Sequence, residues 1–413
     1  MNKNFLALGL AAALLAPQVA GAEGFAINEW SAEGVAMGGA RMFAEDDAAN
    51  VAYNPASITK VKGEAMKSSS TYLSPHGSYK LYDRTGKEIE NEPTHNKVHA
   101  GWAVGSYYVK QINDKEWFGI GAFPRFAMVS EFERGSKASS NAFFSKLNGV
   151  SVTPTYAHKF DKKWSAAVGA EINYVGLELQ KNAFMNPATK VGSVQIEGES
   201  YALGWNAAAN YTFDDKNEIG VVYRSRITHS LEADAKAYSP IPNFNRKANA
   251  YGVVTLPDSW DIGYNHKFDK KTRLELKATR TNWSTYDALN VYFDKPVFNQ
   301  PNALSDKNWE SGWRYAIGLE HNLSDKYAVM AGFAFDESSI PYDGGDFMVP
   351  TGLRRTYSIG ARYNDKKQTV AVALGWMDVG TLDFAGHASD AYSSAHAYDS
   401  FTKIASISYQ RKF

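Results

Sequence analysis

Apolar and polar residues alternate with a period of two over long stretches of this 413-residue chain. In SAAVGAEINY (165–174) the even positions are apolar, and the odd positions from 169 carry Gly169, Glu171 and Asn173. The same pattern recurs in IGVVYRSRIT (219–228), DSWDIGYNHKF (258–268), SGWRYAIGLE (311–320) and LRRTYSIGARY (353–363). Such alternation predicts β-strands with one apolar and one polar face.

These runs are longer than the roughly five or six residues usual for strands of soluble proteins. Their polar faces carry Arg, Lys and Glu, whereas their apolar faces are rich in Tyr and Trp. A transmembrane barrel has this pattern, because one face meets lipid, the other lines the lumen, and aromatic residues gather at the interfaces. Such a sheet must close on itself, since lipid cannot satisfy an unpaired strand edge.

A short charged turn punctuates the strands. HKFDKKW (158–164) returns as HKFDKKT (266–272), and related clusters begin at 112, 212, 322 and 363. They alternate with longer polar segments at 75–95, 134–146, 182–197, 233–248, 294–310, 338–352 and 379–399. Short periplasmic turns and long outer loops are typical of outer-membrane barrels. We therefore predict an all-β antiparallel barrel of about fourteen strands over residues 61–413.

The first 22 residues read as a secretory signal peptide. Lys3 precedes an apolar run from Phe5 to Ala16, and Ala20-Gly21-Ala22 supplies the small residues of a cleavage site. The chain has no cysteine and zero net charge, so it offers no thiolate site and no sign of nucleic-acid binding. These features predict a protein of the bacterial outer membrane.

Residues 23–60 break the alternation and are rich in Gly and Ala. We predict that they form an N-terminal hatch that plugs the lumen. The hatch carboxylates Glu45, Asp46 and Asp47 lack the spacing of an EF-hand, so we expect hydrogen bonds to the barrel wall rather than calcium binding. The apolar residues that either line a ligand pocket or only pack the hatch are Phe25, Ile27, Val35 and Met37.

Several motifs together resemble the FadL/TodX family of transporters for long-chain fatty acids and aromatic hydrocarbons. The hatch carries Gly24-Phe25, Ile27-Asn28-Glu29, Asp46-Asp47-Ala48 and Asn54-Pro55-Ala56, and later come GWNA (204–207), YRS (223–225) and LPDSWDIGY (256–264). The resemblance implies a fourteen-stranded barrel with a hatch, from which ligand leaves sideways at a kinked third strand. The chain end, FTKIASISYQRKF, resembles the strand read by the outer-membrane assembly machinery through its final aromatic residue, Phe413, although Arg411 departs from that pattern.

The matching third strand is WFGIGAFPRFAMVSEF (117–132). Pro124 cannot donate to a sheet ladder, and prolines in sheets are confined mainly to edges and bulges. An ordinary bulge is one interpretation of this position. The resemblance favours the other interpretation, a lateral gate formed by Gly121, Pro124, Arg125 and Phe126.

Four basic residues are predicted on the luminal face and are candidates for binding an anionic head group: Arg224, Arg226, Lys277 and Arg314. Glu171, Glu275, Glu320 and Asp336 are expected on the same face, so charge pairs that only brace the lumen are the alternative.

We thus expect a monomeric transporter of long-chain fatty acids in contact with outer-membrane lipids, with no cofactor and no metal. Uptake of aromatic hydrocarbons or other lipophiles is the alternative, and a general diffusion porin is the second. An outer-membrane lipase or protease is not expected, because none of the nine histidines lies in a recognisable catalytic motif.

Overall fold

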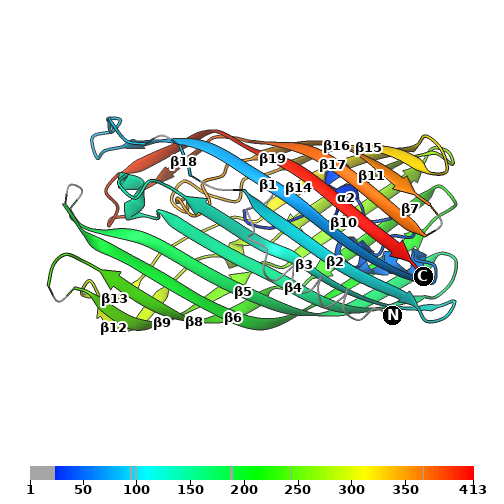
Figure 1. Cartoon of the computed structure of the whole chain (residues 1–413), viewed down its shortest axis with the longest axis horizontal. Coiled ribbons are helices and arrows are strands. Elements are labelled where there is room, and N and C mark those ends of the chain that lie inside the picture. Colours follow the sequence, from blue (N-terminus) through cyan, green and yellow to red (C-terminus); the bar gives the residue numbers. More distant parts are fainter. Residues whose placement is uncertain (1–23, 94, 98–99, 187–188, 243, 366) are drawn as a thin grey trace.

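The computed structural model describes residues 24–413 except 94, 98, 99, 187, 188, 243 and 366, so the predicted signal peptide lies outside the described residues. Nineteen antiparallel strands form one sheet that closes on itself (Figure 1), because β1 pairs with both β2 and β19. The strands are β1 (Glu64–Tyr82), β2 (Gly101–Gln111), β3 (Glu116–Glu131), β4 (Phe144–Lys159), β5 (Trp164–Asn186), β6 (Thr189–Thr212), β7 (Asn217–Arg224), β8 (Ile227–Tyr238), β9 (Arg246–Leu256), β10 (Ser259–Lys267), β11 (Thr272–Thr281), β12 (Val291–Val297), β13 (Gln300–Ala303), β14 (Gly312–Asn322), β15 (Tyr327–Asp336), β16 (Arg354–Asn364), β17 (Gln368–Val379), β18 (Leu382–Ala385) and β19 (Ser394–Lys412).

Five of these strands continue the preceding one at the same place in the wall: β8 continues β7, β10 continues β9, β12 continues β11, β14 continues β13, and β18 continues β17. The described strands therefore form a fourteen-stranded barrel, which confirms the predicted fold. Outside the sheet, the described residues form the short helices α2 (Ala32–Ala36), α3 (Asn50–Tyr53), η1 (Pro55–Lys60), η2 (Lys137–Ser140) and η3 (Trp283–Thr285). Among the described residues, no helix is long and apolar enough to cross a membrane.

The alternation sorts side chains between the two faces of the wall. On β14, Tyr315, Ile317 and Leu319 are exposed on the outside, whereas Arg314 and Glu320 are buried. An apolar exterior is what contact with lipid requires, and the buried charges face the filled lumen.

The repeated turn is a capped hairpin. In the two near-identical copies, Asp161 Oδ1 accepts hydrogen bonds from the amides of Lys163 and Trp164, and Asp269 Oδ1 accepts from those of Lys271 and Thr272. The side chains of Asn113, Asp214, Ser324 and Asp365 accept equivalent bonds in the other four turns. The repeat therefore supplies an acceptor for backbone amides that the sheet leaves unpaired.

Two of the predicted long loops are instead mostly strand. β5 and β6 pair with each other as far as Asn186 and Thr189, so most of 182–197 belongs to the sheet. Likewise β8 and β9 occupy the ends of 233–248. The prediction was wrong there because a polar, exposed strand extension reads like a loop when its pairing partner is not known.

Residues 24–60 lie inside the ring (Figure 1), toward the end at which β19 finishes. Helix α2 packs on β15, β16, β17 and β19, and η1 packs on β3 to β6. The Ala32 amide donates to Ser408 Oγ at 2.8 Å, and the Met42 amide donates to Glu275 Oε2 at 2.7 Å. At Gly332 the backbones touch, because a Cβ there would lie 2.2 Å from the backbone nitrogen of Gly38.

This contact predicts that Gly332→Ala displaces the N-terminal segment from the wall. We expect overpacking against backbone atoms to lower the free energy of unfolding by about 1–3 kcal/mol. Gly375→Ala is the control, because its Cβ would come no closer than 3.3 Å to Ile404 and 3.6 Å to the Tyr357 carbonyl oxygen. Thermal unfolding of the detergent-folded barrels measures both, and equal midpoints for the two variants would contradict the docking described here.

Candidate functional site

The hydrogen-bonded wall is interrupted between β2 and β3. Their ladder runs from Gln111↔Trp117 to Ser106↔Ala122 and then stops. Beyond it, residues 101–105 pair with β1 and residues 123–131 pair with β4, and no ladder joins these two stretches within the described part of the chain. The far side of the interruption is bounded by a bond from the Lys97 amide to the Glu131 carbonyl, at 2.7 Å.

A β-bulge in β3 accompanies this interruption. The register with β4 shifts between Pro124 and Phe126, so Arg125 is the extra residue. The free edge is taken up by the N-terminal segment, where the Ile27 amide donates to the Arg125 carbonyl and the Ala127 amide donates to the Phe25 carbonyl. The N-terminal segment thus supplies hydrogen bonds that β2 would otherwise provide, as a wall in lipid requires.

Arg125 itself points into the lumen and is buried. Its Nη1 lies 3.0 Å from Glu171 Oε2 and donates to the Ser225 carbonyl at 3.2 Å. Its Nη2 donates to the Pro257 carbonyl, also at 3.2 Å. A residue expected at a gate therefore also ties β3 to two distant strands.

An aromatic cluster lies beside the interruption, at the start of the N-terminal segment. The Phe25 ring centroid is 4.6 Å from that of Trp283, 5.4 Å from Tyr286, 5.8 Å from Trp309 and 6.1 Å from Phe126. Leucine, isoleucine and valine side chains of the surrounding strands extend this cluster. The cluster is a buried apolar environment next to the break in the wall.

The four predicted pocket residues do not come together. Phe25 belongs to this aromatic cluster, whereas Ile27, Val35 and Met37 belong to a second apolar cluster formed by the N-terminal segment and the wall. The sequence did not predict the burial of Trp283, Tyr286 and Trp309. These residues lie in or next to predicted loops, where no pattern indicated that a side chain is buried.

Most of the predicted head-group residues are engaged by carboxylates. Asp261 pairs with two of them, because Lys277 Nζ lies 3.1 Å and Arg224 Nη1 lies 2.7 Å from its carboxylate. Arg314 pairs with Asp336 at 2.5 Å. Arg314 also donates to the Gly38 carbonyl at 2.9 Å, and Arg224 donates to that of Ala52. These contacts tie the N-terminal segment to the wall.

Arg226 does not lie on the luminal face, where it was predicted. The strand ends at Arg224, the alternation shifts, and the Arg226 side chain is 59% exposed beside Asp258. Ile227, expected to face lipid, is buried instead.

The Asn54-Pro55-Ala56 motif is a local anchor. The Asn54 side chain accepts from the Ala56 amide and donates to Asn210 Oδ1 at 2.7 Å. Pro55 begins η1, where its missing amide proton has no cost. The motif fastens the N-terminal segment to β6.

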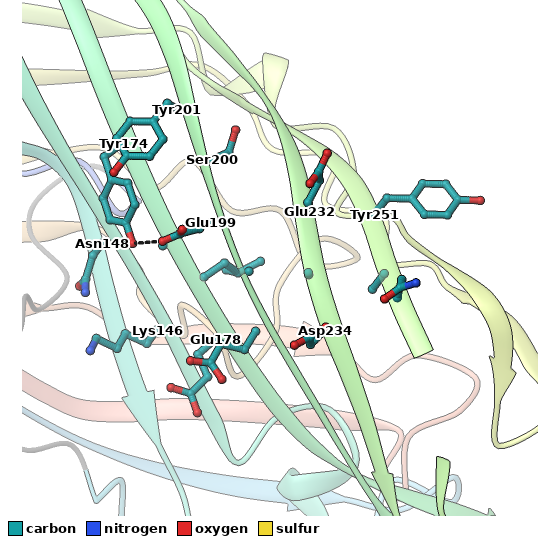
Figure 2. A pocket seen from close by; sticks show the side chains of 17 residues that line it. Lys146, Asn148, Tyr174, Glu178, Glu199, Ser200, Tyr201, Glu232, Asp234 and Tyr251 are labelled. Atoms are coloured by element: carbon teal, nitrogen blue, oxygen red, sulfur yellow. Dashed lines mark hydrogen bonds between the residues drawn. The ribbon is translucent and has the colours of Figure 1, made fainter. Parts of the chain in front are cut away.

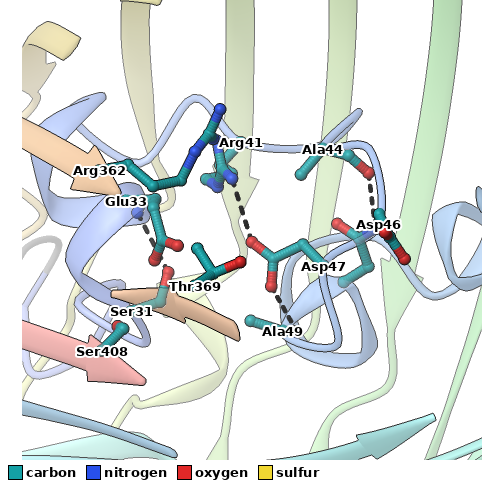
Figure 3. A network of polar contacts seen from close by, with 12 residues as sticks. Ser31, Glu33, Arg41, Ala44, Asp46, Asp47, Ala49, Arg362, Thr369 and Ser408 are labelled. Atoms are coloured by element: carbon teal, nitrogen blue, oxygen red, sulfur yellow. Dashed lines mark hydrogen bonds and ion pairs between the residues drawn. The ribbon is translucent and has the colours of Figure 1, made fainter. Parts of the chain in front are cut away.

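A buried network of charges holds the same segment from the other side (Figure 3). Lys67 of β1 lies 2.7 Å from Glu33 and 2.9 Å from Asp47. Arg41 bridges Asp47 and Glu320 at 3.0 and 3.2 Å, and its contact with Asp47 is drawn in Figure 3. Burial raises the pKa of Asp47, but Lys67 and Arg41 outweigh it and hold that pKa well below its usual range. The sequence did not single out Lys67 or Arg41.

Glu45, Asp46 and Asp47 bind the wall and their own segment, as expected from the sequence. Besides the Asp47 contacts, Asp46 pairs with Lys412, and Glu45 lies 3.1 Å from Lys267. Among the described residues, no group of three or more metal-binding side chains is placed to hold a metal ion.

The sequence profile of the outer-membrane transport protein family (OMPP1/FadL/TodX) matches residues 13–412. The chain belongs to this family. It is 23% identical to the long-chain fatty acid transport protein of Escherichia coli K12, covering 90% of this chain and 91% of that protein. It is 25% identical to outer membrane protein P1 of Haemophilus influenzae, covering 88% and 86%.

Solved structures of the family share the fold. A FadL homologue of Pseudomonas aeruginosa superposes with a TM-score of 0.84 at 17% identity, covering 94% of this chain and all of that one. The toluene transporter TodX of Pseudomonas putida gives 0.71 at 15% identity, covering 95% and 100%. The protein is thus an outer-membrane transport protein of the FadL/TodX family and not an enzyme, as the sequence predicted.

The charge network predicts that Lys67→Met strongly destabilises the seating of the N-terminal segment. Two buried carboxylates would lose their shared cation, which we expect to lower the free energy of unfolding by about 3–5 kcal/mol. Lys80→Met on the same strand is the control, because its pair with Glu88 is exposed and contributes little to stability. Denaturant unfolding measures both, and similar losses would show that the network is not structural.

Proposed function

We propose that this protein carries hydrophobic molecules, long-chain fatty acids first among them, and releases them sideways through the wall between β2 and β3. The observation that carries the proposal is the missing ladder beside the Phe25 aromatic cluster. A ligand held by that cluster lies next to the one stretch of β3 that β2 does not cover.

The opposite route, toward the periplasm, is unfavourable for an apolar molecule. It runs past the ion pairs of Lys67, Arg41 and their carboxylates, which would have to separate in a buried place. Lateral release instead keeps the apolar surface out of water, worth about 25 cal/mol per Å². The lumen filled by residues 24–60 also disfavours a general diffusion porin.

Aromatic hydrocarbons are the second candidate. TodX of Pseudomonas putida is a toluene transporter, and the cage around Phe25 consists of aromatic rings. Arg224, Lys277 and Arg314 each pair with a carboxylate, so a fatty acid head group would have to compete for them. Comparing uptake of oleate and toluene distinguishes the two.

We further propose that residues 23–60 form the hatch domain and 61–413 the barrel. The end of η1 at Lys60 and the start of β1 at Glu64 support this boundary. The exposed ring of Phe413 supports recognition by the assembly machinery.

The lateral route predicts that Pro124→Val slows uptake by restoring a donor at the bulge. Pro154→Val on β4 is the control, because Pro154 lies opposite Ile120, away from the bulge. A change at Gly121 is unsuitable, since a Cβ there would press on Tyr107 and Val51 at 3.0 and 3.1 Å.

We expect labelled oleate uptake by cells to fall for Pro124→Val and to persist for Pro154→Val, with ligand binding by the purified proteins unchanged. Undiminished uptake by the Pro124→Val variant, once the amide introduced at that position is shown to be protected from hydrogen exchange, would refute the lateral route.

A further inference from the structure

The wall is interrupted a second time, between β6 and the β7–β8 strand. β6 pairs with β8 up to Glu199↔Glu232 and with β7 from Asn206↔Arg224 onward. Between them, residues 200–205 lie opposite 225–231, with one backbone bond from the Ser225 amide to the Trp205 carbonyl among the described contacts. We call these two stretches the β6–β8 seam.

The neighbouring wall strand, formed by β9 and β10, is interrupted opposite the same residues. β9 ends at Leu256, opposite Ile227, and β10 begins at Ser259, opposite Arg224. Pro257 lies between them and has no amide to donate. The β7–β8 strand and the neighbouring β9–β10 strand are thus interrupted opposite each other in the wall.

Arg125 joins this place to the first interruption. Its guanidinium donates to the Ser225 and Pro257 carbonyls, which belong to the two broken strands. In lipid, each backbone carbonyl without a hydrogen-bond partner costs several kcal/mol, because the surrounding hydrocarbon offers no donor. One side chain from the β3 bulge therefore stabilises the seam.

Side chains, and not a ladder, close the seam. A Cβ on Gly204 would lie 2.8 Å from Ile227 Cγ1, so Ile227 lies against the bare backbone of β6. Ile227 and Leu231 are buried in the same apolar cluster as Phe25. On the outside, Tyr201 is 70% exposed and Leu203 is 77% exposed. The closure thus separates an apolar lumen from an apolar outer surface.

A hollow of about 870 Å³ adjoins the seam on the outside of the barrel (Figure 2). Tyr174 and Tyr201 lie at its edge, and the Tyr174 hydroxyl donates to Glu199. Its charged lining is Glu178, Glu197, Glu199, Glu232 and Asp234 against Lys146. This excess of carboxylates repels anions.

We propose that the β6–β8 seam is a second lateral portal, which passes uncharged apolar molecules and rejects fatty carboxylates. The proposal rests on the proposed function, because it requires that the lumen holds hydrophobic ligands. Opening the seam separates Ile227 from Gly204 and breaks the bonds between Ser225 and Trp205, whereas opening the wall between fully paired strands would break a ladder. The two lateral routes then sort ligands by charge.

A cysteine pair tests this directly, because the chain has no cysteine of its own. Gly204→Cys with Ile227→Cys places two sulfurs where the Ile227 side chain lies against the Gly204 backbone, so a disulfide locks the seam. The control pair, Ile196→Cys with Ala235→Cys, joins the same strands at directly opposed positions in the intact ladder.

We expect the variant with the oxidised seam pair to lose part of its toluene uptake and to keep its oleate uptake. Adding reductant should restore its toluene uptake. The control pair should keep both. Unchanged toluene uptake with a confirmed disulfide overturns the portal, and equal loss of both substrates overturns its selectivity for uncharged molecules. Absence of uptake of either substrate in the reduced protein would instead refute the proposed function.

Ile227→Ala is an independent variant that does not rely on disulfide formation. It shortens the side chain that closes the seam, so we expect toluene uptake to rise relative to oleate uptake. Toluene uptake equal to that of the unsubstituted protein would also overturn the portal.

Discussion

The need to pair every backbone amide and carbonyl in lipid governs this structure. It closes β1 on β19 and makes fourteen wall strands continuous over most of their length. Where pairing fails, other groups take over: residues 25–27 bond to the free edge of β3, and Arg125 bonds to the Ser225 and Pro257 carbonyls. At these two interruptions the lumen supplies hydrogen-bonding groups, so the contents of the lumen and these openings of the wall are physically linked.

The charges inside the barrel follow from the same constraint. A face turned away from lipid is free to be polar, but filling the lumen buries its charges, which must then pair. Lys67, Arg41 and Arg314 do so with carboxylates and with the N-terminal segment. Charges that the sequence offered as ligand contacts thus hold the segment in place, and the aromatic cluster at Phe25 is left as the apolar environment for a ligand.

Part of the site was predictable because it rests on local rules. Pro124 lacks an amide proton in every context, so a defect in β3 followed from its position alone. Arg226 was misplaced because a break after Arg224 shifts the alternation, and this break lies opposite the one at Pro257 in the neighbouring strand. Trp283 and Trp309 were missed because their burial arises from packing on Phe25, which is distant in sequence.

By itself the sequence determined the barrel, its number of wall strands, the hairpin turns and the family, since alternation, turn capping and motif order are local properties. Only the tertiary structure decided which charges pair, which strand edges stay free and which aromatic residues gather. Those outcomes depend on the register between strands and on how the N-terminal segment fills the lumen. One residue of register moves a side chain to the opposite face of the wall, and no local pattern specifies such a shift.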